Sequence, residues 1–406
     1  MNARVRGFAL VITLALLGLL VLAVVALSAL VQVNSQVVAS ATAQLRARQH
    51  AQLALGVALS ELQRVAGPDA RVTGIAGITG TGPGAANTTR HWCGVWRSDG
   101  SFLGWLASGA QPAAAALATG VPDIELLGAA AVGAPAANSE HVVAGKLGVP
   151  DADGVPTGRY AWLVLDEGVK TSAYAPSPVG TAPVLFANAA NAQARLRDAL
   201  AAYAGALPRV STYEQLRVLP APAAALTAST LQDNLHHVTL TARWVVGDQL
   251  RTGFQNVNTN SAIAWRNLLQ TYNTSPDAPA PISAATLLAR GTSLQNAVAG
   301  FSTAGKAAFG PFTAAAGASA LLASVFPSGS PTGTQIHAVL APQLAVRSDT
   351  FRVRAYGEAL DPADRSRIEA AAWCEAIVQR TPAVAPDGLG RRFVVVSFRW
   401  LGPGDL

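Results

Sequence analysis

The most strongly apolar stretch of the chain lies near its start. Residues 8–31 form a run of 24 residues without a charge, and the next charged residue is Arg46. A helix needs about 20 apolar residues to cross a bilayer, so residues 8–33 are predicted to span a membrane. The first proline is Pro68, so the same helix is predicted to continue to residue 66, well beyond the bilayer.

Past the predicted membrane span, the apolar positions collect on one side of the helix. Leu55, Leu59 and Leu62 follow i, i+4, i+7 spacing, which places them on one face. Gly67 and Pro68 then end the helix. We expect this stripe to pack on a head formed by residues 70–406.

Short runs of alternating or continuous apolar residues predict an antiparallel sheet in the head. Residues 91–108 read as a hairpin, and residues 351–356 alternate as a strand with only one buried face. Residues 368–380 fit either a helix or a strand, and we expect a strand in a three-stranded C-terminal meander. Residues 107–157 are rich in Ala, Gly and Pro and are expected to be mostly irregular. The predicted strands are residues 91–96, 101–106, 159–165, 236–246, 351–356, 368–380 and 392–401.

The middle of the chain has helical rather than strand patterns. Residues about 185–335 are therefore predicted to form a helix-rich insertion within the head. The whole chain is expected to be α+β, with a long N-terminal helix packed on an antiparallel sheet. The predicted helices are residues 188–207, 211–216, 261–272 and 283–289.

Three interpretations of the N-terminal segment remain open. A cleaved secretory signal has an apolar core of about 7–15 residues, which is shorter than this one. A plain signal anchor fits the length. The third interpretation is a prepilin-type leader, because Arg4 and Arg6 precede Gly7, and Gly7 is followed by Phe8 and the long apolar helix.

This junction resembles the prepilin peptidase site of type IV pilins and type II secretion pseudopilins. The resemblance implies that residues 1–7 are removed after Gly7 and that Phe8 becomes a methylated N-terminus. It also implies a single pass through the bacterial inner membrane, with the N-terminus cytoplasmic and the head outside. The implied partners are prepilin peptidase, membrane lipid and, through the helix, other pilins or pseudopilins.

The fifth position after Gly7 departs from the pilin pattern. Most pilins carry Glu there, where it can pair with a neighbouring subunit's N-terminal amine, but this chain has Ile12. A carboxylate in lipid is costly unless it is paired, so a subunit with no subunit ahead of it can do without the charge. The departure implies a minor, tip-type subunit similar to K-type pseudopilins and PilX-like proteins.

Four segments in the head, together with one just after the helix, resemble the Verru_Chthon cassette protein A family. That family consists of predicted pilin-like proteins without an assigned biochemical activity, so it implies an architecture and an assembly context but no catalytic residues. The segments are residues 67–73, 159–170, 351–362, 371–382 and 390–401.

Charge and cysteine content narrow the function further. The net charge is +6, carried mostly by scattered arginines; nucleic-acid binding would need them on one face, so we expect no nucleic-acid partner. The two cysteines, Cys93 and Cys374, each follow a Trp on a predicted strand. An oxidising compartment permits a disulfide between them, and two separate buried thiols fit equally well.

Candidate catalytic and metal-binding motifs are weak. Residues 300–306 have P-loop spacing but Ala307 replaces the Ser or Thr that would hold magnesium. His236 and His237 point to opposite faces of a strand, with His337 as a distant third candidate. Four acids at 151, 153, 166 and 167 lack the spacing of a calcium loop. We therefore expect no enzyme activity, no cofactor and no metal site.

The sequence thus favours a minor pilin or pseudopilin, a structural component of a type IV pilus or type II secretion-like filament. The alternative is a membrane-anchored extracytoplasmic enzyme, or a module that binds carbohydrate or another ligand. The mature N-terminus distinguishes the two, since only the first is cut after Gly7.

Overall fold

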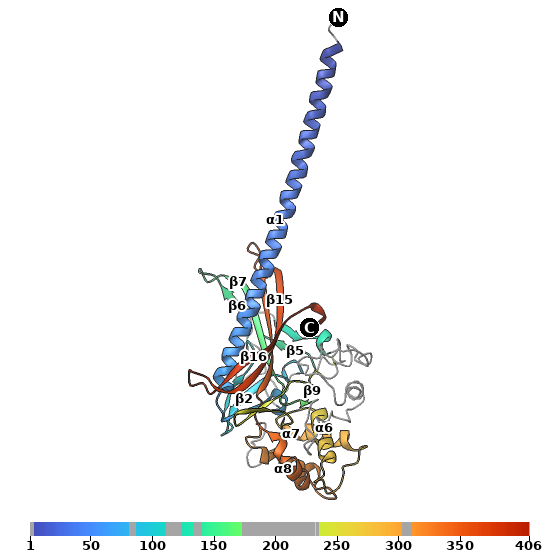
Figure 1. The fold of residues 1–406 in the computed structure, drawn as a ribbon, viewed down its shortest axis with the longest axis vertical. Coiled ribbons are helices and arrows are strands. Elements are labelled where there is room, and N and C mark those ends of the chain that lie inside the picture. The colour runs from blue at the N-terminus through green and yellow to red at the C-terminus, as the bar shows by residue number, and fades with distance from the viewer. Residues whose placement is uncertain are drawn as a thin grey trace.

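The computed structural model describes residues 4–80, 87–110, 123–132, 140–172, 232, 235–302 and 310–405. The fold is α+β, as predicted, with one long helix and a head built around a five-stranded sheet (Figure 1). Helix α1 (Arg4–Ala66) has 63 residues, which corresponds to about 95 Å at 1.5 Å per residue. Its lower half lies along the head, and its upper half extends far beyond it (Figure 1).

The five-stranded sheet is antiparallel throughout. Its last three strands in sequence are neighbours, so the predicted C-terminal meander is confirmed, and residues 368–380 belong to a strand. Strand β7 joins the sheet beside β14 although the two are far apart in sequence. The order is β16 (Arg391–Leu401), β15 (Ile368–Val384), β14 (Thr350–Leu360), β7 (Pro156–Asp166) and β6 (Leu147–Pro150).

The predicted hairpin near residue 100 is also present. Strands β2 (Cys93–Arg97) and β3 (Phe102–Trp105) pair around it, and β1 (Arg71–Ile75) adds a third strand. Residues 107–157 were expected to be mostly irregular, and for their described part this is wrong. Backbone amides that leave water need hydrogen-bond partners. In this region β6 pairs with the large sheet, and β4 (Ile124–Leu127) pairs with β5 (Val142–Ala144). One turn of helix, α2 (Ala129–Val132), follows β4.

The single strand expected at residues 236–246 is broken in two. β9 (Val238–Thr239) and β10 (Trp244–Val246) are separated by a bend. Partners from distant segments hold the bend, because the Thr239 hydroxyl donates to Glu167, and the backbone N–H of Arg243 donates to the Thr350 hydroxyl. The other short strands are β8 (Thr171–Ser172), β11 (Gln249–Arg251), β12 (Gln255–Asn256) and β13 (Leu344–Ala345).

Helices occupy the end of the head farthest from the N-terminus (Figure 1). The one predicted at 261–272 is α6, with the Ser261 hydroxyl accepting from the Ala264 N–H at its start. The one predicted at 283–289 begins later, as α7. The expected helices at 188–207 and 211–216 lie outside the described residues. The bounds are α6 (Ala262–Thr274), α7 (Leu287–Val298), α8 (Ala318–Val325) and α9 (Gly333–Leu340).

The central strand β14 is buried on both faces, so its interpretation as a half-buried strand was wrong. Arg352 and Arg354 look like surface residues in the sequence, yet both are enclosed by ion pairs. Their guanidinium groups lie 2.9 Å from the carboxylate oxygens of Glu375 on β15. Burial alone raises the pKa of Glu375, but these two arginines and Arg399 lower it well below its usual range. Buried charges are tolerated when they are paired in this way.

Candidate functional site

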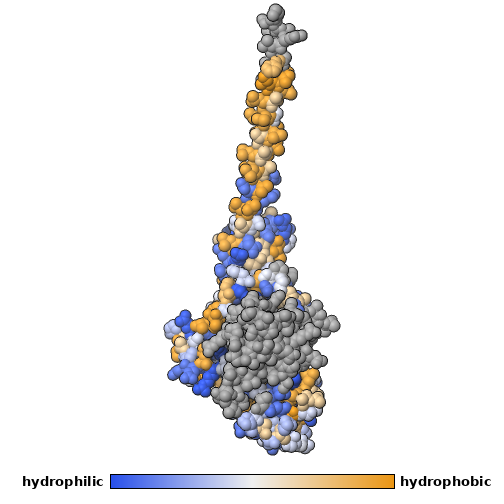
Figure 2. All heavy atoms as spheres, turned by 45° about the vertical axis from the view of Figure 1, so that its right-hand side comes forward, coloured by the Kyte–Doolittle hydropathy of each residue, from blue (hydrophilic) through white to orange (hydrophobic). Residues whose placement is uncertain are grey.

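The upper half of α1 is an apolar surface that the head leaves uncovered. Every side chain from residue 10 to residue 42 is exposed, and Figure 2 shows the apolar residues gathered along this part of the helix. Among the described residues, α1 is the one helix that is long enough and apolar enough to cross a membrane. Large exposed apolar surfaces mark contact with lipid or with other proteins.

The residues of the predicted leader junction lie in the first turns of this helix. α1 begins at Arg4 and passes through Gly7 without a break. The Phe8 side chain is 69% exposed, and Ile12, at the position where most pilins carry Glu, is 46% exposed. Cleavage after Gly7 would thus leave Phe8 at the start of an uninterrupted helix.

The lower half of α1 packs on the sheet through alanine. The innermost positions are Ala47, Ala51, Ala54, Ala58 and Leu62, each with no exposed surface. The predicted stripe is therefore confirmed at Leu62, whereas Leu55 and Leu59 lie at its half-buried margin. Alanine takes the central positions because its small side chain lets the helix backbone approach the strands closely.

Glycine on β14 completes this close approach. A Cβ atom at Gly357 would lie 2.2 Å from the backbone N of Ala51 and 2.3 Å from the carbonyl oxygen of Ala47. Gly158 on β7 likewise faces His50, whose Nδ1 is 2.8 Å from the Glu358 carbonyl oxygen. Because backbone atoms cannot move aside cheaply, these contacts fix where α1 crosses the sheet.

Polar contacts hold the lower end of α1. The Gln63 amide donates to the carbonyl oxygens of Leu389 and Arg391, and its own oxygen accepts from the Phe393 N–H at 3.0 Å. Just past the helix, the Asp69 carboxylate meets Arg380 at 2.5 Å and Arg391 at 3.1 Å. These bonds attach the helix end to the β15–β16 hairpin.

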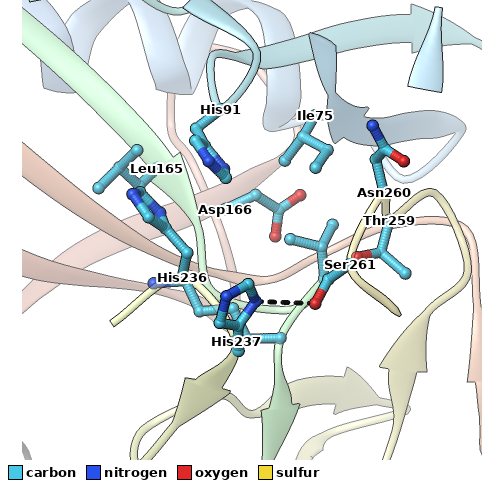
Figure 3. Close-up of a pocket in the computed structure, with 11 residues that line it drawn as sticks. Ile75, His91, Leu165, Asp166, His236, His237, Thr259, Asn260 and Ser261 are labelled. Atoms are coloured by element: carbon cyan, nitrogen blue, oxygen red, sulfur yellow. Dashed lines mark hydrogen bonds between the residues drawn. The ribbon is translucent and has the colours of Figure 1, made fainter. Parts of the chain in front are cut away.

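A second candidate site is a small pocket lined by three histidines (Figure 3). His91 precedes β2, while His236 and His237 precede β9. The rings of His91 and His236 stack with centroids 3.7 Å apart and planes 6° from parallel. Glu140, just before β5, joins them, with its carboxylate 2.9 Å from His91 Nε2 and its backbone oxygen 2.7 Å from His236 Nε2.

Burial determines the protonation state of the three histidines. It lowers the pKa of His91, lowers that of His236 well below its usual value, and lowers that of His237 to about 4. Burial alone raises the pKa of Glu140, but the hydrogen bond from His91, together with nearby positive charge, lowers it to about 2. The pocket therefore holds neutral imidazoles beside an ionised carboxylate at neutral pH.

This grouping is not predicted from the sequence. His337, the third candidate beside His236 and His237, lies apart from them on α9, with its Nε2 3.4 Å from the Ala315 carbonyl oxygen. The partners of His236 are His91 and Glu140, which lie 145 and 96 residues before it in the chain. Only the pairing of distant segments brings them together, so no spacing in the sequence could have indicated it.

The two cysteines are free, buried thiols in the structure, which corresponds to the second of the two alternatives above. Their sulfur atoms lie 3.8 Å from different backbone oxygens, that of Gly94 for Cys93 and that of Ala51 for Cys374. Burial raises the pKa of Cys374 to about 12 and that of Cys93 well above its usual value. Neither thiol is therefore activated for chemistry.

The remaining sequence candidates do not form a site among the described residues. Asp151 and Asp153 precede β7, whereas Asp166 and Glu167 lie at its far end, about 30 Å away at the rise of a β-strand. Asp151 accepts backbone bonds within its own turn. Most of the P-loop-like segment at 300–306 lies outside the described residues.

Comparisons with known proteins add little to the geometry described above. No family model matches the chain, so its likeness to the Verru_Chthon cassette family stays a prediction, and no curated protein matches it. Among solved structures it is similar to a chain of the GspK–GspI–GspJ complex from the type 2 secretion system of enterotoxigenic Escherichia coli. The sequence identity is 15%, the match covers 64% of this chain and 84% of that chain, and the TM-score is 0.32. The assignment of the fold rests on the geometry described above.

Proposed function

We propose that this chain is a minor pilin or pseudopilin, a structural component of a type IV pilus or a type II secretion-like filament. The observation that carries the proposal is the single helix α1, whose exposed apolar half continues directly into a half packed on the head. A membrane anchor alone needs about 20 residues. The continuous helix that joins the anchor to the head is therefore longer than anchoring requires, and we assign it a role in assembly. In a filament, the exposed half would leave the lipid and pack against the helices of other subunits.

The same proposal assigns the details at the N-terminus. Prepilin peptidase cuts after Gly7, Phe8 is methylated, and the head lies outside the bacterial inner membrane. Ile12 suits a tip position, since an apolar side chain there needs no partner ahead of it. The partners of the assembled form are other pilins or pseudopilins, which contact the exposed half of α1.

The mature N-terminus tests the proposal. The full-length protein is expressed in a bacterium that has prepilin peptidase, purified from membranes and measured intact by mass spectrometry. We expect a chain that begins at methylated Phe8, and we expect Gly7→Leu to block the cut. Gly18→Ala is the matched control, because a Cβ there meets nothing within 4 Å, and it should be processed normally. Retention of Met1 in the unaltered protein contradicts the proposal and favours a plain signal anchor.

A further inference from the structure

His91, Glu140 and His236 bring three potential metal ligands together from three separate segments. One ligand atom of each side chain lies within 4.8 Å of the other two. We propose that these residues bind one divalent transition-metal ion, and that Zn²⁺ fits them best. Two imidazoles and one carboxylate form a donor set that zinc takes in proteins, usually with water in the remaining position.

The spacing of the donors is close to what zinc requires. His91 Nε2 and Glu140 Oε2 are 2.9 Å apart and share a hydrogen bond. Zn–N and Zn–O distances of about 2.0–2.1 Å in a tetrahedron place neighbouring ligand atoms about 3.3 Å apart. A widening of a few tenths of an ångström therefore lets the ion replace the shared proton.

The two imidazoles need a larger adjustment. Their rings stack within 6° of parallel, so their nitrogen lone pairs lie in nearly parallel planes rather than converging on one point. Binding requires the rings to tilt apart, and it competes with the hydrogen bond between His236 Nε2 and the Glu140 carbonyl oxygen. Both rings line the same small pocket (Figure 3), so the ion would enter from that side.

Neighbouring groups hold the carboxylate in place and limit the net charge. Arg90 Nη2 lies 3.6 Å from the other Glu140 oxygen, Oε1, so Oε2 stays available to the ion. Ligating carboxylates are commonly held by such outer contacts. Lys170 also faces the pocket, but its ammonium group is paired with Glu167 at 2.5 Å, which reduces its repulsion of a cation.

The nitrogen donors separate this site from a calcium site. Calcium and magnesium prefer oxygen ligands in sets of six or more, whereas imidazole suits zinc and its neighbours in the first transition row. The ion would connect three segments of the chain, which lie just before β2, just before β5 and just before β9. A metal that bridges segments remote in sequence favours the folded state, because those segments are apart when the chain unfolds.

Metal content of the intact protein tests the proposal. The full-length chain, without a polyhistidine tag, is purified in detergent micelles, stripped with a chelator and dialysed against ZnCl₂ in excess CaCl₂. We expect one zinc per chain by elemental mass spectrometry, a higher melting temperature with zinc, and visible absorption bands when Co²⁺ replaces it. Absence of retained zinc, or zinc that calcium displaces, overturns the proposal.

Three substitutions locate the ion. His236→Gln and Glu140→Gln should each weaken zinc affinity about 100-fold or more, and His91→Gln should do the same. Glu140→Gln keeps the shape of a partly exposed side chain, so it serves where a histidine variant fails to fold. The matched control is His141→Gln, which breaks the His141–Glu125 pair, 2.8 Å apart, and should leave zinc binding unchanged. Zinc binding that survives the first three changes, or that is lost in the control, places the ion elsewhere and overturns the assignment.

Discussion

The two halves of α1 are both apolar, but they differ in what covers them. From residue 10 to residue 42 every side chain is exposed, and the apolar ones up to Val33 are mainly Leu and Val around the whole circumference. From Ala43 onward the buried side chains lie on one face, and the central ones are alanine. Large side chains on all sides suit lipid or a bundle of helices, whereas small side chains on one side suit a backbone that lies directly on a sheet.

The comparison shows that apolar content alone does not indicate burial. Both halves contain many apolar residues, yet the upper half is exposed on all sides, whereas the lower half buries one face on the sheet. The polar residues make the difference, because Arg46, Arg48 and Gln52 mark the outer side of the lower half. The upper half has no polar side from residue 8 to residue 31.

The largest expected effect comes from placing charge in the upper half. Leu16 and Leu20 lie one helical turn apart and are both exposed. Changing both to Asp should cost about 6 kcal/mol of membrane insertion, since one acid at the centre of a span costs about 3 kcal/mol. The melting temperature of the head should stay the same, because the head does not cover these residues. Carbonate extraction of membranes measures the first effect, and circular dichroism of the detergent-solubilised protein measures the second.

The control makes the same change in the lower half. Leu45 and Leu53 are also exposed, and the double change to Asp there should leave the protein in the membrane fraction. Equal loss of both double variants from membranes would mean that the two halves do not differ as described. Release of neither would show that attachment to the membrane does not depend on the apolar surface of residues 8–31.

A smaller effect is expected where the lower half touches the sheet. Gly357→Ala places a methyl group 2.2 Å from the backbone of α1, and overpacking of this kind costs about 1–3 kcal/mol. Denaturant unfolding followed by tryptophan fluorescence measures the change. Gly148→Ala, on the edge strand β6, is the matched control, since its Cβ would meet only Pro156, at 3.9 Å. Equal midpoints for the two variants would mean that α1 does not lie this close to β14.

Local patterns predicted much of the fold, because they need only the residues of one element. The alternation at 91–106 and the apolar run at 392–401 are matched by β2, β3 and β16, and the N-terminal run is matched by α1. Ser261 marked the start of a helix because its hydroxyl caps that helix.

Features that depend on distant partners could not be predicted in this way. Arg352 and Arg354 are polar in the sequence and buried in the fold, because Glu375 on the next strand neutralises them. The predicted stripe consists of leucines, yet Ala47 and Ala51 are fully buried because Gly357 on β14 faces them from the sheet. The histidine pocket requires three segments to meet, and nothing within any one of them indicates the other two.

The smallest expected effect tests the lower end of α1. Burial alone raises the pKa of Asp69, but hydrogen bonds and charge from Arg380 and Arg391 lower it on balance. A carboxylate with a lowered pKa stabilises the fold above its unfolded pKa of 3.8, and that contribution is lost as the pH falls through the folded value.

The Asp69 side chain is 63% exposed, so we expect Asp69→Asn to cost less than about 1 kcal/mol at pH 7. The difference should shrink in high salt and disappear once the pH lies below the lowered pKa of folded Asp69. Asp153→Asn, in the exposed turn before β7, should change stability less at every pH. A loss at pH 7 that persists unchanged in acid would show that Asp69 acts through its shape and not through its charge.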